Sequence, residues 1–267
     1  MSLQGVYKTA KKDGTVSYRS SITFHNKHIS LGSFSNETEA HHAYKTAWLL
    51  LTESEYYLHD YTKSSCLSFE KWVSLINYRD NHIYFSTPIY LMKSYFLYYL
   101  SPELELKFSL DDLFYYSSHK IMKRNGHLFV ADYGMQVNLY SRYGIKNYAI
   151  RGKDYEFINQ DPYEFRLENI RVLNTYYGVD QVRRNNKLYF RSRIHIRSYY
   201  LIGFYESALE AAIAYNKAID VLKKNGINKN YTMNYIDEVS PQTYADIYHQ
   251  IIIPETILQI KEAPNKT

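Results

Sequence analysis

One sequence segment occurs twice in this chain of 267 residues, over residues 5–47 and again over residues 178–218. Each copy opens with Gly-Val, continues through a polar stretch that contains Arg-Ser, and reaches Leu-Gly or Ile-Gly before an alanine-rich end. The alanine-rich ends match at a constant offset of 171 residues, at Glu39, Ala40, Ala43, Tyr44 and Ala47. A repeated segment is one supersecondary unit formed more than once. The repeat therefore predicts two copies of one small fold.

The middle of the second copy alternates between cationic and apolar residues. Arg191, Arg193, His195 and Arg197 share one parity, whereas Ser192, Ile194 and Ile196 share the other. A period of two is typical of a β-strand with two unlike faces. The stretch after Tyr205 has helical spacing instead, with apolar residues at Ala208, Ala211, Ala212, Tyr215, Ala218, Ile219 and Leu222. We therefore predict a small antiparallel sheet that has a helix across its back and a bare arginine face.

The first copy is expected to form the same unit. Asn26-Lys27 predicts a tight turn between strands over 16–25 and 28–34, and Asp13-Gly14 predicts a turn before them. A helix is predicted from Glu37 to about Thr52. The exposed sheet face of this copy would carry Tyr7, Arg19, Ser21, Thr23 and His25. This face has less charge than that of the second copy, so we expect weaker binding to a polyanion, or binding to a different site.

Positive charge is concentrated in the two copies. Residues 176–205 hold six Lys/Arg against the single acid Asp180, and residues 5–34 hold five against Asp13. These two windows carry charges of +5 and +4, although the whole chain has a net charge of only +5. A concentrated basic face favours a polyanionic partner such as nucleic acid.

The second copy also resembles a known family. The text GV…YFRSRIHI…IGFYES…EAAIAYNKA resembles the AP2/ERF DNA-binding domain in its bacterial and phage form. The resemblance implies a three-stranded sheet in the major groove of double-stranded DNA, with a helix packed behind the sheet. The plant form carries tryptophans on this face that are missing here, so its sequence preference does not transfer.

The resemblance also implies which residues contact DNA. On the second copy they would be Arg191, Arg193 and His195, with Arg197 and Tyr199 at the following turn. Further basic residues of the two copies would add contacts, namely Arg183, Arg184, Lys187, Lys11 and Lys12.

Residues 152–172, with the sequence GKDYEFINQDPYEFRLENIRV, resemble the ββα core of HNH homing-type endonucleases. The matching scaffold positions are Ile158, Asn159, Asp161, Arg166 and residues 168–171. Modules of this family are frequently followed by an AP2 domain, as in this chain. The resemblance implies a helix that carries Arg166 and Arg171, which would either bind DNA or form a solvated basic face.

The residues that carry the chemistry of that family are replaced. A histidine serves there as general base, a neighbouring aspartate helps to hold a divalent metal, and a loop asparagine orients the histidine. The corresponding positions here are Phe157, Glu156 and Phe165. Because a phenyl ring cannot accept a proton, loss of the base should lower the rate by about 10²–10⁴. We therefore expect no enzyme activity, no catalytic or metal-binding residues and no cofactor.

Other chemical motifs and targeting segments are not found. Cys66 is the single cysteine, so no internal disulfide can form. His25 and His28 flank a predicted turn and need not converge on a metal. No apolar run approaches the roughly 18 residues of a membrane span, and the first residues lack the features of a signal peptide. We expect a cytoplasmic protein of a bacterial cell or a phage-infected host, without a membrane partner.

These observations predict an α+β chain with five parts. Helices are expected from Pro88 to Leu100, from Ser109 to about His119, and from Pro241 to about Ile252. The parts are a first AP2-like domain (1–54), a mainly helical linker region (55–125), a degenerate HNH-like ββα module (126–175), a second AP2-like domain (176–239), and a C-terminal helix and tail (240–267).

The predicted function is sequence-selective binding of double-stranded DNA by a phage or mobile-element protein, for example in transcription regulation. Two alternatives stay open. One is a divergent metal-dependent HNH nicking or homing endonuclease that uses Glu156, Asp161 and Glu164. The other is a protein that binds and inhibits a host nuclease or defence complex.

Overall fold

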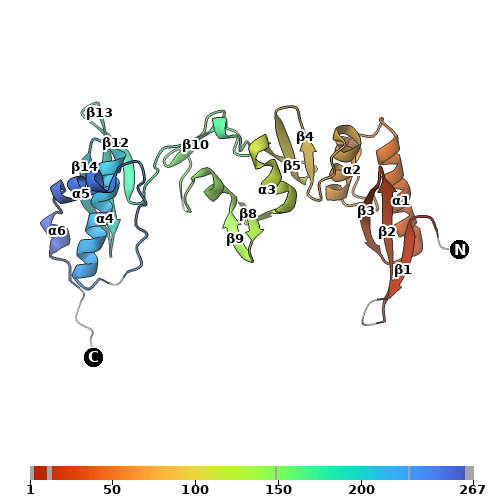
Figure 1. The fold of residues 1–267 in the computed structure, drawn as a ribbon, viewed down its shortest axis with the longest axis horizontal. Coiled ribbons are helices and arrows are strands. Elements are labelled where there is room, and N and C mark those ends of the chain that lie inside the picture. The colour runs from red at the N-terminus through yellow and green to blue at the C-terminus, as the bar shows by residue number, and fades with distance from the viewer. Residues whose placement is uncertain (1–2, 11–13, 148, 228, 262–267) are drawn as a thin grey trace. The chain divides into compact units, whose positions relative to one another are not determined.

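The structure is a computed structural model that describes residues 3–10, 14–147, 149–227 and 229–261. The fold is α+β (Figure 1). The described residues form four three-stranded antiparallel sheets, one two-stranded sheet and six α-helices. The chain divides into two compact units, of which the first holds residues 1–143 and 157–170 and the second holds residues 144–156 and 171–267.

The first copy of the repeat forms a three-stranded sheet with one helix, and we call it the first module. Its strands are β1 (Val6–Ala10), β2 (Val16–Phe24) and β3 (Lys27–Phe34), in the order β1-β2-β3. The helix α1 (Glu37–Thr52) has the predicted bounds, and the Asn36 side chain caps it by accepting a hydrogen bond from the Glu39 amide. The turn between β2 and β3 lies at His25 and Asn26, one residue before the predicted position. The predicted turn at Asp13-Gly14 includes Asp13, which lies outside the described residues.

The second copy forms the second module in the same way. Its strands are β12 (Val179–Arg184), β13 (Lys187–His195) and β14 (Tyr199–Tyr205), and its helix is α4 (Ala208–Lys224). The Ser207 side chain caps α4 by accepting a hydrogen bond from the Glu210 amide. Each sheet has its helix across one face, and the other face is turned away from that helix (Figure 1).

The two modules share strand register as well as architecture. Tyr7 pairs with Arg19 in the first module, and Asp180 pairs with Arg191 at the equivalent position of the second. Each central strand then has a register shift at the same place, after Ser20 in β2 and after Ser192 in β13. Equal register with an equal irregularity shows that the repeat in the sequence is a repeat in three dimensions.

A close contact between a glycine and a tyrosine recurs in both modules. Gly5 and Gly178 have positive φ angles of 75° and 71°. A Cβ atom on Gly5 would lie 2.0 Å from the Tyr44 ring of α1, and a Cβ atom on Gly178 would lie 2.2 Å from the Tyr215 ring of α4. Only glycine combines this backbone conformation with so close an approach to the helix.

Small and branched residues fill the space between each sheet and its helix. In the first module, Ile22, Ile29 and Leu31 of the sheet pack with Ala43, Ala47 and Leu50 of α1. In the second module, Ile194 and Ile202 pack with Ala214, Ala218 and Ile219 of α4. Alanine on the inner side of each helix lets the helix lie close to the strands. The predicted alternation and helical spacing are therefore confirmed for both copies.

The rest of the first unit holds short helices and two further sheets. The helices are α2 (Phe69–Asn81) and α3 (Leu113–Ser118). One sheet contains β4 (Ile89–Leu91), β5 (Tyr95–Ser101) and β6 (Leu104–Ser109), and the other contains β7 (Ile121–Arg124), β8 (His127–Asp132) and β9 (Met135–Asn138). The prediction of a mainly helical region over 55–125 is thus only partly met.

The helix predicted from Pro88 to Leu100 is wrong, because this stretch forms the hairpin of β4 and β5. Within β5, Phe96 and Tyr98 are buried and alternate with more exposed neighbours, as expected for a strand. Aromatic side chains favour strands over helices, and this preference outweighs the proline at the expected helix start.

The α-helix expected in the HNH-like stretch does not form either. The stretch contains β10 (Tyr155–Phe157), the single 3-10 turn η4 (Leu167–Asn169) and β11 (Ile170–Val172). Arg166 precedes the turn and Arg171 lies in β11, so they do not share a helix. The Asn169 side chain accepts a hydrogen bond from the Asn159 amide and donates one to the Glu164 carbonyl. These bonds join Asn169 to residues ten and five positions earlier in the chain, and the segment between them turns and does not form an α-helix.

The C-terminal part of the second unit packs on α4. It contains α5 (Pro241–Gln250), which begins at the predicted residue, and the short helix α6 (Glu255–Leu258). The Lys217 ammonium of α4 donates hydrogen bonds to the carbonyls of Tyr248 and Ile251. Among the helices of the described chain, none combines the length and the apolar character needed to span a membrane.

Replacing Gly5 by alanine tests the contact between β1 and α1. We expect Gly5→Ala to lower the free energy of unfolding by roughly 2–4 kcal/mol, since it adds a clash with Tyr44 to an unfavourable φ angle. Gly14→Ala is the matched control, because Gly14 has a φ of 81° but no atom within 4 Å of its added Cβ. We expect the control to cost about 1 kcal/mol. Both tryptophans, Trp48 and Trp72, lie in this unit, so denaturation followed by tryptophan fluorescence measures the difference; equal losses would contradict the prediction.

Candidate nucleic-acid interface

The sheet face of the second module that is turned away from α4, here called the outer face, gathers the predicted contact residues. Directly paired residues of antiparallel strands share a face. Arg191 therefore lies beside Asp180 and Phe204, Arg193 beside Leu201, and His195 beside Tyr199. Ser192 and Ile194, which have the other parity, are fully buried on the α4 side.

A carboxylate lies between the two central arginines. The Arg191 Nη2 donates to Asp180 Oδ2 at 2.6 Å and its Nε donates to Oδ1 at 3.2 Å. The Arg193 Nε lies 3.4 Å from the same Oδ1. The hydrogen bonds that Arg191 donates to Asp180 raise the pKa of Arg191 above its ordinary value.

The outer face is therefore not as bare as predicted. The side chains of Arg191 and Arg193 keep 30% and 27% of their surface exposed, and the Asp180 side chain keeps 10%. Asp180 offsets one of the two positive charges. The arginines are nevertheless open to solvent and available to a partner.

Beyond Arg193 the outer face continues with Tyr199 and His195, and Lys229 from later in the chain contacts His195. The Arg193 guanidinium lies over the ring of Tyr199, with 4.9 Å between the Cζ atom and the ring centroid, and the His195 ring meets the Tyr199 ring edge-on. The Lys229 ammonium lies 3.0 Å from the carbonyl oxygen and 3.2 Å from the Nδ1 of His195. Arg197 is exposed in the turn between β13 and β14. The structure thus brings four of the predicted contact residues together, namely Arg191, Arg193, His195 and Tyr199.

The remaining predicted cations of this module lie near the turn between β12 and β13. The Arg184 guanidinium covers the Phe204 ring at 4.5 Å, so it lies on the outer face. Lys187 pairs with Glu206. Arg183 pairs across the strands with Leu188 and thus lies on the opposite face from Arg191, where it is exposed.

The outer face of the first module carries fewer charges. Tyr7 is 60% exposed beside its cross-strand neighbour Arg19, which is also exposed. Ser21 and Thr23 continue the same parity along β2, and His25 lies in the turn that follows. No carboxylate pairs with Arg19 within the described part of the chain. Lys11 and Lys12 lie outside the described residues.

A hollow of about 320 Å³ lies beside Arg193 and Tyr199 within the second unit, and Lys146 and Tyr177 contribute to its lining. The Lys146 ammonium is buried and lacks a hydrogen-bond partner in the described chain, although it lies 4.3 Å from the centre of the Tyr177 ring. Burial lowers the pKa of Lys146 to about 8. An unsatisfied buried cation adds to the positive potential near the outer face.

Sequence reasoning missed the roles of Asp180 and Lys229. Asp180 was visible as the only acid of its window, but its pairing with both arginines depends on strand register. Lys229 lies in a stretch without periodic pattern, and its approach to His195 depends on the path of the chain after α4.

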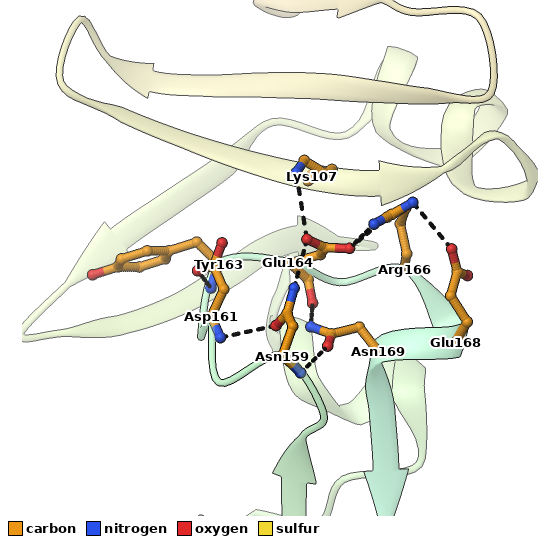
Figure 2. A network of polar contacts seen from close by, with 8 residues as sticks. All are labelled: Lys107, Asn159, Asp161, Tyr163, Glu164, Arg166, Glu168 and Asn169. Carbon is orange, nitrogen blue, oxygen red and sulfur yellow. Dashed lines mark hydrogen bonds and ion pairs between the residues drawn. The ribbon is translucent and has the colours of Figure 1, made fainter.

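Glu164 is the centre of a polar network in the HNH-like stretch (Figure 2). Its side chain is almost fully buried and accepts hydrogen bonds from Lys107, Asn159 and Arg166. Backbone hydrogen bonds between Lys107 of β6 and residues 163 and 165 hold the segment in place. Burial alone would raise the pKa of Glu164, but the hydrogen bonds and charges of Arg166 and Lys107 outweigh it and hold the pKa below its ordinary value.

The acids considered as metal ligands are already engaged. Glu164 is saturated by its donors, Glu156 pairs with Arg171, and Asp161 accepts a hydrogen bond from the Tyr163 amide. Over the part of the chain that the structure describes, no group of three His, Cys, Asp or Glu side chains could hold a metal ion. Arg166 and Arg171 both pair with carboxylates, so the expected free basic face is not present at these two residues.

The two phenylalanines at positions of HNH chemistry are core residues. Phe165 is fully buried and stacks on Phe108, with ring centroids 5.4 Å apart. Phe157 is 3% exposed and meets the Phe165 ring edge-on at 5.8 Å. Neither ring can transfer a proton, and both stabilise the packing of the first unit.

Comparison of the chain with protein-family models, with curated proteins and with solved structures returns no match.

Replacing Glu164 tests the buried network. We expect Glu164→Gln to lower the free energy of unfolding by roughly 2–4 kcal/mol, because it removes the charge that Lys107 and Arg166 share. Glu168→Gln is the control, since Glu168 also pairs with Arg166 but its side chain is 66% exposed; we expect less than about 1 kcal/mol. Because the folded pKa is lowered, the contribution of Glu164 is present at neutral pH and is lost as pH falls below about 4. Tryptophan fluorescence of unfolding at pH 7 and pH 3 measures both effects, and an equal loss at the two pH values would contradict the assignment.

Lys146→Met tests the buried ammonium. The folded pKa lies below the ordinary value, so the penalty of burying the charge is full below about pH 8 and disappears as pH approaches 10.5. We expect the variant to be more stable than the native chain by roughly 1–3 kcal/mol at pH 7, and to lose this advantage by pH 10.5. Lys153→Met, at an exposed position of the same segment, should change stability little. Hydrogen exchange over residues 171–225 at several pH values measures the difference, and a pH-independent gain would contradict the prediction.

Proposed function

We propose that this chain is a sequence-selective double-stranded DNA-binding protein whose two modules are AP2-like and contact DNA through the outer faces of their sheets. The observation that carries the proposal is the double occurrence of one three-stranded sheet with the same register, backed each time by a helix. In the second module the outer face presents Arg191, Arg193 and His195 to solvent. The concentration of the chain's positive charge in these two segments supports the same conclusion.

Affinity and selectivity would come from different groups on these faces. Contacts of lysine and arginine with phosphates supply most of the affinity, which therefore falls with salt. Selectivity needs groups that reach base edges in the major groove, where arginine pairs with the O6 and N7 atoms of guanine. Arg191 and Arg193 have such groups, and the exposed Leu201 beside Arg193 suits a thymine methyl group.

The two modules would recognise different sequences because their outer faces differ. The first module has Tyr7 and Ser21 where the second has Asp180 and Arg193. Two DNA-binding modules on one chain also raise the overall affinity, since binding of one places the other at a high effective concentration near the same duplex.

The HNH-like stretch fits best as a scaffold without catalytic activity. Its candidate base position holds the buried Phe157, and Glu156 and Glu164 are engaged with cations. The pairing of such a stretch with AP2-like modules is typical of phages and mobile elements, so we propose a role of this origin in the cytoplasm, such as transcription regulation.

A protein-binding role is the second candidate, and one observation favours it. On α1 of the first module, Trp48 and Leu49 are 47% and 40% exposed beside a hollow that His41 and Lys45 also line. The α4 residue at the position of Trp48 is Ile219, which is fully buried in a cluster with Ile251 and Ile257 of the C-terminal segment. A host nuclease or defence protein could bind the uncovered face of α1. A pull-down partner that survives high salt and DNase, with no DNA binding at about 0.1 M salt, would favour this role.

Selection of bound sites from random duplexes at two salt concentrations tests the DNA-binding function. We expect an enriched sequence that contains guanine, and affinity that falls steeply with salt. Arg193→Ala should weaken binding to the enriched duplex by roughly 1–3 kcal/mol and relax its specificity.

Lys224→Ala is the matched control, because it removes one exposed positive charge from the end of α4 and not from the sheet. It should weaken binding to the enriched and to a scrambled duplex equally, and by less. If Arg193→Ala also weakens both duplexes equally, Arg193 contacts phosphate only. If no sequence is enriched at either salt concentration, sequence-selective binding is refuted.

A further inference from the structure

We propose that Asp180 is a positioning residue that orients Arg191 and Arg193 toward guanine edges and thereby sets the sequence preference of the second module. The inference rests on the DNA-binding function proposed above. It concerns a residue whose charge opposes DNA binding, and this opposition makes its role testable.

The contacts of Asp180 leave the hydrogen-bonding edges of both arginines available. A guanidinium has five N–H groups, one on Nε and two on each Nη atom. Arg191 donates hydrogen bonds from its Nε and one Nη2 hydrogen to Asp180, whereas Arg193 forms an ion pair with Asp180 through its Nε. The Nη1 and remaining Nη2 hydrogens have no hydrogen-bond partner in the described chain. These hydrogens form the end of the guanidinium that can donate two bonds to one guanine.

Asp180 also restricts the motion of the two side chains. A free arginine has many rotamers, and fixing them on binding opposes affinity. Arg191 is held by two bonds to one carboxylate, and Arg193 is held between that carboxylate and the Tyr199 ring. Donors that are oriented before binding discriminate better among bases, because a displaced base edge leaves them unpaired.

The spacing of the arginines limits the sequence that they can recognise. Alternate residues of a strand lie about 6.6 Å apart, which is close to two base steps of about 3.4 Å. The ion pairs of both arginines with Asp180 Oδ1 bring the two guanidinium groups toward each other. The second module should therefore prefer two guanines that are separated by no more than one base pair.

Among its described residues, the first module lacks a carboxylate that pairs with two arginines of the sheet. Tyr7 occupies the position of Asp180, opposite Arg19, and Ser21 follows the register shift where the second module has Arg193. A single arginine beside a tyrosine cannot form the same arrangement. The guanine preference should accordingly belong to the second module alone.

A carboxylate that acts only through its charge and a carboxylate that orients arginines have different effects on DNA binding when they are removed. A carboxylate on a DNA-binding surface repels phosphates, so its removal should strengthen binding to every duplex. A carboxylate that orients arginines should, on removal, reduce the difference between preferred and other duplexes. The ratio of the affinity for the preferred duplex to the affinity for other duplexes therefore distinguishes an orienting carboxylate from one that acts only through its charge.

The experiment uses the full chain with Asp180→Ala, Asp180→Asn and the matched control Glu206→Ala. Glu206 is an exposed acid of the same module that also pairs with a cation, Lys187. Affinities are measured for the enriched duplex, for duplexes with each guanine replaced in turn, and for a scrambled duplex. We expect both Asp180 variants to lower the ratio of enriched to guanine-replaced affinity by about 5- to 50-fold, while binding the scrambled duplex as well as or better than the native chain. Glu206→Ala should leave the ratio unchanged.

The outcomes distinguish a failure of the positioning role of Asp180 from a failure of the DNA-binding function. Equal strengthening on all duplexes by the Asp180 variants would overturn the positioning role and leave the DNA-binding function intact. Absence of any preference in the native chain would overturn both. Circular dichroism checks that each variant is folded; if Asp180→Ala is not, Asp180→Asn, which keeps the size of the side chain, decides by the same ratio.

Discussion

The contact between a glycine at the start of each sheet and a tyrosine of the helix behind it determines what each module presents to solvent. With no Cβ at Gly5 or Gly178, the first strand can lie against the ring of Tyr44 or Tyr215. This contact sets how the helix lies across the sheet, and strand register then decides which residues point away from it. Because both constraints recur, the two outer faces are built on the same frame and differ only in their side chains. A surface of this kind can change its preference for a partner without a change in fold.

Two acids of this protein, Asp180 and Glu164, each pair with two cationic side chains. On the outer face of the second module, Asp180 pairs with two arginines that would otherwise repel each other and holds them close together. In the HNH-like stretch, Glu164 joins Lys107 and Arg166 and maintains a low pKa despite its burial. The first arrangement leaves donors open to solvent, whereas the second uses its charges within the fold. The number of basic residues in a segment is thus a poor measure of the positive surface that it offers.

Local patterns predicted the modules well because local interactions form them. The alternation along β13 and the helical spacing of α4 both act over a few residues, and the structure has each where it was expected. The failures arose where tertiary contacts decide. Residues 88–100 satisfy a helix-start pattern but form a hairpin, and Arg166 lies at a turn that distant asparagine contacts define. The partnership of Lys229 with His195 had no local pattern from which it could be predicted.

The aromatic packing around Phe157 limits the chemistry that this part of the chain could acquire. Phe157 is 3% exposed and contacts the fully buried Phe165, which in turn stacks on Phe108. A histidine placed at position 157 would have its imidazole inside this apolar cluster, where the neutral form is favoured but no phosphodiester can reach it. A general base at this position would therefore require an open cluster as well as a different side chain. A single substitution at position 157 would not supply hydrolysis.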